Sequence, residues 1–508
     1  MSAAARVVIR TDATATIGAG HAMRCLALAG ALRRQGAEVL LYGDVGTAIA
    51  ERYAEAGATV VEPTPGEQTD RTLARNRLGG LLSSGGPAMA WTVFDGYGFD
   101  ADDHAAARQA GARVLVVDDY GHLPWYGADI ILNQNISADA VQYAASPGCV
   151  VLRGLKYVLL RQEFESRGGR ESRPGKERAA RSLPEVLVSM GGADPGNATL
   201  AILRALPGDL LRRIHLHLLV GPHNPHRDSL LHWVQASGAH AVIHSAVRDM
   251  PSLLAGMDVA VTAAGSTCWE LMCMGLPFAT VVLADNQRGI AGRLDAEGVA
   301  RSAGTLEGAA PEGAARAAAL LGELLDDSAG AKGRAEMAMR LVDGRGALRV
   351  AGAMLLDGHF LRPVVAEDCE ALWRLANDPS ARAASFNSAS IELADHRKWF
   401  ARRLVDPNVL LFLLVTGDDE PVGYVRFERR EHGWIVSVAL APDARGRGLG
   451  SRLIARATAL FRQRWNEPVT ALVKADNAAS LAAFRRAGYV DADERPQDGL
   501  VARSLLFA

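Results

Sequence analysis

His21 lies in a glycine-rich stretch near the start of the chain, TIGAGHAMRC, which spans residues 16–25. An apolar run, RVVIR, precedes this stretch and an alanine- and leucine-rich segment follows it, so a strand is expected to pass into a helix here. A neutral imidazole can take a proton from water near neutral pH, and a position at a helix N-terminus disfavours its charged form. We therefore interpret His21 as a candidate general base, and Gly20 as a position where a ligand can come close.

A second glycine-rich turn stands near the other end of the chain, in LAPDARGRGLGSRLIARA. A strand is expected to end near Leu440, and the glycines lead directly into an amphipathic helix. Glycine lets the backbone approach an anion closely, and the free N–H groups at a helix start point toward it. The pattern predicts a pyrophosphate-binding loop formed by Arg445, Gly446, Arg447, Gly448, Leu449 and Gly450.

Two further stretches, SMGGADPGN and TAAGSTCWE, place glycine between a predicted strand and a predicted helix. The first helix should begin near Asn197. Helix starts of this kind bind anions, and a carboxylate one turn into the second helix would suit the two hydroxyls of a ribose. An ordinary strand-to-helix turn has the same composition, so both interpretations stay open. The residues concerned are Gly191 and Gly192 in the first stretch, and Gly265, Ser266, Thr267 and Glu270 in the second.

The elements that must position these residues follow a regular pattern over the first 350 positions. Short apolar, β-branched runs such as EVLLYG, WTVFDGY, RVLVVDDY, EVLVSMGG and MDVAVTAAG alternate with alanine-rich helical stretches. Continuous apolar strands that alternate with helices predict parallel sheets covered on both faces. Two such α/β halves would enclose a cleft, because open sheets of this type bind ligands at the C-terminal ends of their strands.

The pattern changes from about Phe360, where VLLFLLV, PVGYVRFE and WIVSVALAP indicate a meander of antiparallel strands. A polar tract rich in arginine and glycine, ESRGGRESRPGKERAARS, is interpreted as a linker between the first two halves. The predicted boundaries are 1–164 for the first half, 165–182 for the linker, 183–357 for the second half and 358–508 for a separate C-terminal domain.

Composition excludes several classes of function. The chain has 508 residues, with Lys+Arg 55 against Asp+Glu 57, so a nucleic-acid partner is not expected. Its five cysteines include no C-x-x-C pair, so we expect neither disulfides nor a metal site. The absence of a signal peptide or a long apolar run predicts a cytoplasmic protein without a membrane partner. Asp100 and Asp102 resemble a D-x-D metal motif but are interpreted as a solvated helix start, and Asp118 and Asp119 as structural.

The C-terminal segment resembles the GNAT family of acetyl-CoA-dependent N-acetyltransferases. The family pattern V-x-P-x-x-R-G-x-G-x-G is matched from Leu440 to Gly450, with Leu440 in place of valine. The resemblance implies that this loop binds the pyrophosphate of acetyl-CoA, and that the preceding strand, with Val438, pairs with pantetheine. A second family element is matched by NAASLAAFRRAGY, with Asn477 and Ser480; here Phe484 stands where many members carry a tyrosine that protonates the leaving thiolate.

The acceptor side of this domain also resembles a subset of GNAT enzymes. The stretch NDPSARAASFNSASIELADHRKWF is similar to members that acetylate the 4-amino group of nucleotide-linked sugars. The resemblance makes Arg382, Phe386, His396 and Trp399 candidates for the acceptor site. For His396, a helix-surface position without a role in binding is the competing interpretation.

The first 350 residues resemble GT-B sugar-nucleotide enzymes. The pattern small-Gly-Ser/Thr-x-x-x-Glu, then Gly-x-Pro, then Asn-Gln includes Asn286 and Gln287 as well as the turn at Gly265. RTDATATIGAGHAMRCLALA, VFDGYGFD, SMGGADPGN and GSTCWELMCMGLP narrow this to the hydrolases of pseudaminic acid synthesis, which remove UDP from UDP-2,4-diacetamido-2,4,6-trideoxy-β-L-altropyranose. That likeness implies His21 as the base. Asp12 and Tyr97 are expected at strand ends that face the same cleft, as substrate-positioning groups, with Tyr97 a catalytic candidate beside His21. Arg161 is expected to reach the sugar or the diphosphate.

The predicted fold is therefore α/β, with two Rossmann-like, GT-B-like halves followed by a GNAT domain. The predicted function is bifunctional: acetyl-CoA-dependent acetylation of a UDP-linked 4-amino-sugar, then hydrolytic release of UDP with inversion at C1. The alternatives are a GT-B glycosyltransferase with a fused GNAT domain, a hydrolase for a related legionaminic-type UDP-sugar, and a nucleotide-sugar sensor without catalysis.

Overall fold

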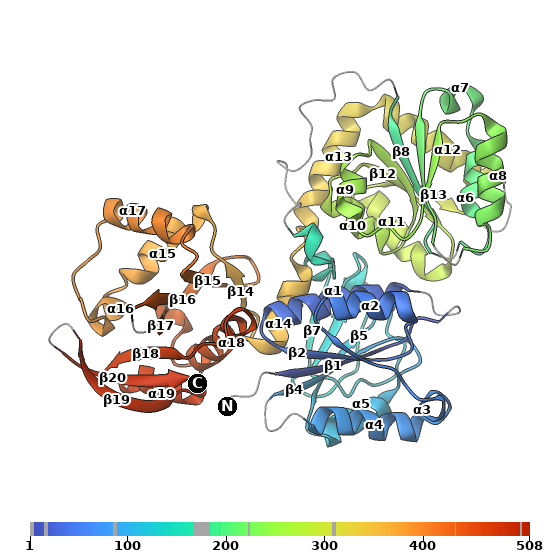
Figure 1. Cartoon of the computed structure of the whole chain (residues 1–508). Helices are drawn as coiled ribbons and strands as arrows, with labels where there is room; N and C mark the ends of the chain where they lie inside the picture. The colour runs from blue at the N-terminus through green and yellow to red at the C-terminus, as the bar shows by residue number, and fades with distance from the viewer. Residues whose placement is uncertain are drawn as a thin grey trace.

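The computed structural model of the chain describes residues 5–14, 19–84, 89–165, 183–192, 194–221, 224–306, 311–431, 433–497 and 500–507. Three β-sheets organise these residues, two of them wholly parallel and one mixed (Figure 1). The first two are Rossmann-like and together GT-B-like, and the third is the sheet of a GNAT domain, as the sequence predicts. Most of the linker predicted at 165–182 lies outside the described residues. No helix in the described part of the chain is long and apolar enough to cross a membrane.

The first sheet is parallel, with strand order β3-β2-β1-β4-β5-β6-β7. Helices α1 and α2 cover one face and helices α3, α4 and α5 cover the other (Figure 1). The order reverses between β1 and β4, and a crevice opens at such a switch point, outside the C-terminal strand ends. The strands are β1 (Arg6–Thr11), β2 (Glu38–Tyr42), β3 (Thr59–Val61), β4 (Ala90–Asp95), β5 (Arg113–Val117), β6 (Ile130–Asn133) and β7 (Val150–Arg153). The helices are α1 (Gly20–Arg34), α2 (Thr47–Glu55), α3 (Pro65–Thr69), α4 (Arg71–Ser83) and α5 (Ala101–Gln109).

The second sheet repeats this plan, with parallel strands in the order β10-β9-β8-β11-β12-β13. Its switch point lies between β8 and β11, so the turns after these strands face the same crevice. The strands are β8 (Glu185–Ser189), β9 (His215–Leu219), β10 (Ala241–His244), β11 (Val259–Ala263), β12 (Phe278–Val282) and β13 (Arg301–Thr305). The helices are α6 (Ala198–Ala205), α7 (Gly208–Leu211), α8 (Arg227–Ser237), α9 (Met250–Ala255), α10 (Thr267–Cys273), α11 (Arg288–Ala296), α12 (Pro311–Asp326) and α13 (Ser328–Leu341).

The third sheet is mixed, in the order β14-β15-β16-β17-β18-β20-β19, and only its β17–β18 pair is parallel. The strands are β14 (Phe360–Pro363), β15 (Val409–Val415), β16 (Pro421–Arg430), β17 (Gly433–Leu440), β18 (Val469–Lys474), β19 (Val490–Gln497) and β20 (Leu500–Phe507). The helices are α15 (Cys369–Ala376), α16 (Pro379–Ala384), α17 (Leu393–Leu404), α18 (Leu449–Arg464) and α19 (Ala478–Arg486).

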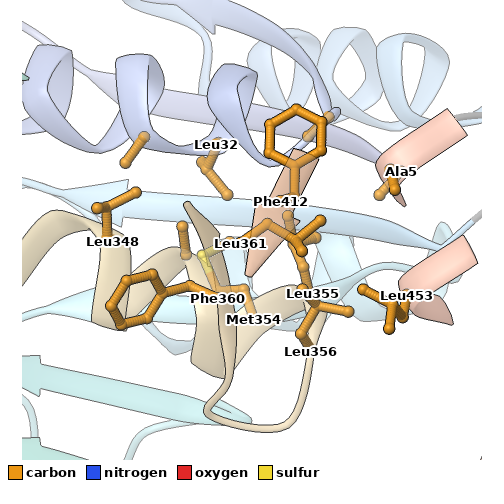
Figure 2. Packing of buried hydrophobic residues seen from close by; sticks show 14 of the residues in the cluster. Ala5, Leu32, Leu348, Met354, Leu355, Leu356, Phe360, Leu361, Phe412 and Leu453 are labelled. Atoms are coloured by element: carbon orange, nitrogen blue, oxygen red, sulfur yellow. The ribbon is translucent and has the colours of Figure 1, made fainter. Parts of the chain in front are cut away.

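One hydrophobic core joins the first and third sheets. Helix α14 (Gly346–Leu355) leaves the second sheet and packs between them, and its last residues lead directly into β14. Figure 2 shows side chains of α1, α14, β14, β15 and α18 in one cluster, where Leu32, Met354, Phe360 and Leu453 are all buried. The sequence predicts a separate C-terminal domain, whereas the third sheet shares its core with the first.

Candidate active sites

A cleft of about 970 Å³ lies between the first two sheets. Loops that follow the strands of both sheets line it, as the two switch points require. From the first sheet come the predicted residues Asp12, Gly20, His21 and Tyr97, and from the second Gly265, Ser266, Asn286 and Gln287. Sequence positions more than 260 residues apart therefore meet in one site.

His21, the second residue of α1, is held by a buried carboxylate. Its Nδ1 lies 2.6 Å from Oδ1 of Asp95, the last residue of β4. Burial works to raise the pKa of Asp95, but the charge and hydrogen bonds of Arg24 and the hydrogen bond from His21 outweigh it and lower the pKa to about 2. The carboxylate is therefore ionised and can only accept, so Nδ1 carries the proton and donates it. Nε2 of His21 is left as the basic nitrogen.

Arg24 lies one turn after His21 on the same face of α1 and joins two carboxylates. Its Nε donates to Asp95 at 2.7 Å, and another guanidinium nitrogen donates to both oxygens of Asp119 at 2.9 and 3.0 Å. Burial alone would lower the pKa of Arg24, but Asp119 and Asp95 raise it well above its usual value, so this group stays a cation. Two carboxylates and one guanidinium therefore lie beside the imidazole of His21.

Tyr97 completes this cluster at the mouth of the cleft. Its hydroxyl donates to Asp119 at 2.8 Å, and its ring meets the His21 ring edge-on, with the centroids 5.1 Å apart. Burial, and after it the charge of Asp119, raise the pKa of Tyr97 well above its ordinary range, so the phenol keeps its proton. Asn135 also donates to Asp119, at 2.8 Å. Tyr97 is thus fixed as a neutral group that a substrate would contact beside His21.

Sequence analysis did not identify Asp95 or Arg24, and it interpreted Asp119 as structural. Asp95 ends a predicted strand in WTVFDGY, and Arg24 lies three residues after the candidate base. The position at a switch-point strand end and the helical spacing were the signals available for them. The neighbouring Asp118 does have a structural arrangement, because it accepts from the backbone N–H groups of Tyr120 and Gly121.

On the opposite wall of the cleft, helix α10 begins without a side-chain cap. Gly265 and Ser266 line the cleft at this helix start, where backbone N–H groups favour an anion. Asn286 and Gln287 lie in a short 3-10 helix after β12, and the Gln287 side chain accepts from the backbone of Leu283 at 2.9 Å. This wall presents mainly backbone and amide groups.

Three predicted ligand-binding side chains are not part of this lining. Thr267 is the first residue of α10 but does not line the cleft. Arg161 and Glu270 pair with each other, and the guanidinium lies 3.5 Å from the carboxylate. Burial raises the pKa of Glu270, with Arg161 acting in the opposite direction. Arg161 also contacts Glu163 at 3.3 Å. In this structure Arg161 and Glu270 therefore form an ion pair, and their contacts with ribose and diphosphate stay a prediction.

The anion site predicted at Gly191 and Gly192 lies beside a helix start that the chain itself caps. Helix α6 begins at Ala198, and the carboxylate of Asp194 already accepts from the backbone N–H groups of Ala198 at 2.7 Å and Thr199 at 3.0 Å. A carboxylate of the chain itself therefore occupies the position that a phosphate would need. Neither glycine lines the cleft.

A second cleft, of about 1300 Å³, opens in the third sheet. Strands β17 and β18 pair only from Trp434 to Val436 and then diverge, so the remainder of β17 lies beside open space. Val438 and Leu440 line the cleft at this point, as do Gly446, Gly448 and Gly450 from the predicted pyrophosphate loop. Gly446 and Gly448 have φ values of +78° and +74°, which only glycine adopts readily.

The remaining residues of the predicted pyrophosphate loop do not all line the cleft. Helix α18 starts after Gly448 without a side-chain cap, so its first N–H groups lie at the cleft. The Leu449 side chain is buried in the core, and Arg447 is exposed; neither lines the cleft. The Arg445 guanidinium donates to the carbonyl of Leu440 at 2.9 Å and to Asp378. Arg445 lines the cleft, and its side chain holds the loop in place through these bonds within the protein.

The segment NAASLAAFRRAGY, which begins at Asn477, lies on the facing side of this cleft. The Asn477 side chain accepts from the backbone N–H of Ser480 at 3.0 Å and so caps helix α19. Phe484 is 3% exposed, lines the cleft and packs edge-on against Tyr489, with the ring centroids 5.1 Å apart. This wall offers an apolar ring where a proton donor would otherwise stand.

Arg382, Phe386, His396 and Trp399 all line the far end of this cleft. His396 is 4% exposed, so the helix-surface interpretation is wrong. Its Nε2 has no hydrogen-bond partner in the described part of the chain, and burial lowers its pKa. A neutral imidazole thus lies between the rings of Trp399 and Phe400.

Basic side chains outnumber acidic ones at this far end, although Arg426 and Arg430 both pair with Glu428 behind the lining. Asp395 is the single acidic side chain among the described residues that line the cleft, and it lies 3.8 Å from Lys398. The Arg426 guanidinium stacks over the Trp399 ring at 5.2 Å. Such a surface attracts anions and repels polycations. Its basic side chains are Arg382, Lys398, Arg402, Arg426 and Arg430.

Comparison with known proteins assigns the third sheet to a family. Residues 370–489 match the model of the Acetyltransferase (GNAT) family, so the chain carries a GNAT acetyltransferase domain in its C-terminal part. A solved spermidine N-acetyltransferase from Vibrio cholerae, in complex with CoA and spermine, is 15% identical with a TM-score of 0.28; the match covers 30% of this chain and 95% of that one.

The N-terminal region has distant relatives. The uncharacterized protein MJ1062 of Methanocaldococcus jannaschii is 22% identical over 292 residues, which is 56% of each chain. The UDP-2,4-diacetamido-2,4,6-trideoxy-beta-L-altropyranose hydrolase of Campylobacter jejuni is 30% identical over 118 residues, 23% of this chain and 39% of that protein. The chain thus spans between 39% and 56% of the length of these two curated relatives.

Proposed function

We propose that the chain is a bifunctional enzyme that acts on a UDP-linked amino-sugar. The GNAT domain acetylates the 4-amino group with acetyl-CoA, and the cleft between the first two sheets then hydrolyses the sugar–diphosphate bond. The products are UDP and free 2,4-diacetamido-2,4,6-trideoxy-L-altropyranose, released with the opposite configuration at C1, or a related diacetamido sugar. The observation that carries the hydrolytic assignment is that His21 lines that cleft while the buried Asp95 holds its Nδ1.

In the hydrolytic step, water attacks C1 of the sugar as the bond from C1 to the diphosphate oxygen breaks. Nε2 of His21 takes a proton from the attacking water, and Asp95 stabilises the imidazolium that forms. The electron pair of the broken bond leaves with the diphosphate, which the backbone N–H groups at the start of α10 would receive. Water enters opposite the leaving group, so the configuration at C1 inverts.

In the acetylation step, the free amine attacks the thioester carbonyl of acetyl-CoA. The C–S bond breaks, the acetyl group joins the nitrogen, and the amine proton and the thiolate recombine through solvent or another donor, because Phe484 cannot supply one. The glycine loop before α18 would bind the pyrophosphate of acetyl-CoA, and the open side of β17 would pair with pantetheine. The Asn477 cap keeps the facing helix start in place.

The positive far end of the second cleft supports a nucleotide-linked acceptor. A polycationic amine would be repelled by the guanidinium and ammonium groups there, whereas a nucleoside diphosphate attached to the sugar carries the complementary charge. The Trp399 ring, with the Arg426 guanidinium stacked over it, offers a flat surface for a base or sugar.

A time course followed by ¹H and ³¹P NMR tests both steps together. Incubation of the full chain with UDP-4-amino-sugar and acetyl-CoA should give the N-acetylated UDP-sugar first, followed by UDP and the free inverted sugar. Acetylation without any release of UDP would overturn the bifunctional proposal. Transfer of the sugar to an added alcohol in preference to water would favour the glycosyltransferase alternative.

A further inference from the structure

A carboxylate and three imidazoles gather on the second sheet, outside both clefts. Glu185 is the first residue of β8, His215 and His217 lie on β9, and His244 is the last residue of β10. Residues two apart on a strand point to the same face, so His215 and His217 share one face of the sheet. The parallel register places Glu185 beside His215. This cluster is independent of the residues assigned to either reaction.

One carboxylate oxygen of Glu185 contacts two of the rings. Its Oε2 lies 2.9 Å from Nδ1 of His215 and 2.6 Å from Nε2 of His217, and the three atoms all lie within 4.8 Å of one another. Zn²⁺ binds imidazole nitrogen and carboxylate oxygen at about 2.0–2.2 Å, so two ligand atoms of one tetrahedral ion stand about 3.3 Å apart. The two contacts of the Glu185 oxygen lie within about 0.7 Å of that spacing, so a small movement of the Glu185 side chain would make room for an ion between this oxygen and the two ring nitrogens.

His244 holds His217 in the orientation that a metal ligand needs. Nδ1 of His217 lies 2.8 Å from Nε2 of His244, and the two rings stack with an interplanar angle of 8°. If His217 binds a metal through Nε2, its Nδ1 carries a proton and donates it to His244. Histidine ligands usually keep their second ring nitrogen in such a hydrogen bond, which fixes the tautomer and the ring orientation. His244 is therefore a positioning residue for this cluster.

The cluster is accessible to ions and still ordered. The side chains of His215, His217 and Glu185 are 32%, 13% and 15% exposed. The partial exposure of His215 leaves room for water as a fourth ligand, while the neighbouring strands fix the other groups. Two imidazole nitrogens and one carboxylate oxygen suit zinc and similar transition metals, whereas calcium and magnesium prefer oxygen ligands alone.

We propose that Glu185, His215 and His217 bind one divalent transition-metal ion such as Zn²⁺, with His244 orienting His217. The ion would connect the starts of β8 and β9 and stabilise the second sheet. It takes no part in acetylation or hydrolysis. The competing arrangement is a cluster in which the Glu185 oxygen accepts hydrogen bonds from both imidazoles and no metal binds.

Calorimetric titration of the chelator-treated full chain with ZnCl₂ distinguishes these arrangements, and Co²⁺ gives a visible spectrum that reports tetrahedral coordination. We expect uptake of one ion by the cluster and a higher Tm with zinc. Glu185→Gln and His217→Ala should each abolish that uptake, and His244→Ala should weaken it by about 10- to 100-fold. The control is His232→Ala, which removes an exposed imidazole on α8 and should leave uptake unchanged.

The proposal is overturned if the chain binds neither Zn²⁺ nor Co²⁺, or if uptake persists undiminished in Glu185→Gln and His217→Ala. It is also overturned if uptake is lost in His21→Leu and retained in the cluster variants, because the ion would then belong to the hydrolytic cleft. Circular dichroism and the acetylation rate of each variant show that the chain is folded, so a loss of metal binding cannot be attributed to unfolding.

Discussion

In the proposed mechanism His21 acts as a base only while its proton stays on Nδ1, and the contact with Asp95 keeps the proton there. The buried carboxylate cannot donate, so it selects the tautomer whose Nε2 is free to accept. Arg24 and Asp119 extend the arrangement, because the guanidinium keeps Asp95 ionised and Asp119 holds both Arg24 and Tyr97. The reactivity of one imidazole thus depends on groups from four segments of the first sheet.

Asp95→Asn should abolish most hydrolysis without unfolding the chain. The asparagine amide can donate to Nδ1, which moves the imidazole proton to Nε2 and removes the base. We expect kcat for UDP release to fall by about 10³- to 10⁴-fold, the size of effect seen when a supporting aspartate is replaced in a serine-protease triad. The acetylation rate should be unchanged. Near wild-type UDP release in Asp95→Asn would contradict the tautomer assignment, and Asp100→Asn, at the cap of α5, is the matched control.

Asp118 should contribute to the acid stability of the chain. Burial works to raise its pKa, but hydrogen bonds from His122, Tyr126 and the following backbone N–H groups outweigh this and lower the pKa from 3.8 to about 2. A lowered carboxyl pKa gives stability that is complete above the unfolded value and is lost as the pH falls toward 2. Urea midpoints measured between pH 5 and 2 should therefore fall less steeply in Asp118→Asn than in wild type. Equal slopes would contradict this role.

At the scale of elements, helix starts and diverging strands determine where anions can bind. Helices α10 and α18 both begin at a cleft without a side-chain cap, whereas the start of α6 is occupied by Asp194. The same strand–glycine–helix pattern therefore leads to two helix starts without a side-chain cap and one that is capped by a carboxylate. Helix α17 adds positive charge at the far end of the second cleft, which Lys398 and Arg402 line.

Reversal of that charge should weaken binding of the acceptor alone. In Arg402→Glu we expect KM for the UDP-linked amine to rise about 10-fold or more, because a like charge faces the diphosphate, and the effect should shrink at high salt. KM for acetyl-CoA should stay the same. Lys332→Glu, an exposed change on α13, is the control. An unchanged KM for the acceptor, or a better one, would show that this end of the cleft does not receive the nucleotide.

The sequence predicts elements better than the contacts between them. Glycine turns, apolar strands and the two family patterns identified the parallel sheets, His21 and the loop before α18, because each signal lies within a short segment. Asp95, Asp119 and the metal-ligand candidates come from separate strands, and only the sheet order brings them together. The cap that Asp194 forms on α6 was not predicted for another reason. It involves a left-handed backbone turn, with φ of +40° at Asp194, which the sequence pattern did not indicate.

At the scale of the whole molecule, the acetyltransferase part is fixed to the first sheet. Gln35, at the end of α1, is fully buried and forms two hydrogen bonds of 2.8 Å with the backbone N–H and carbonyl of Leu361 in β14. Because β14 is an edge strand of the third sheet, this side chain satisfies groups that would otherwise lack a partner strand. Together with the shared core around α14, it joins the third sheet to the first (Figure 2).

Gln35→Ala should destabilise the chain through this junction. It leaves a buried N–H and a buried carbonyl unsatisfied, at a cost of about 1–3 kcal/mol each. Chemical denaturation should show a clearly lower midpoint than wild type, with the third sheet affected together with the first. Gln463→Ala removes an exposed side-chain bond to the carbonyl of Arg33 at the same junction and should change little. A Gln35→Ala midpoint equal to that of wild type would contradict the stabilising role of Gln35 at this junction.

Both proposed reactions can be followed in one sample, because both clefts belong to the same chain. The most direct test is His21→Leu in the full chain, with acetylation and UDP release recorded in one NMR time course. We expect acetylation of the UDP-amino-sugar at the wild-type rate and no release of UDP, so that the acetylated UDP-sugar accumulates. Release of UDP at the wild-type rate by His21→Leu would contradict the assignment of this imidazole as the hydrolytic base.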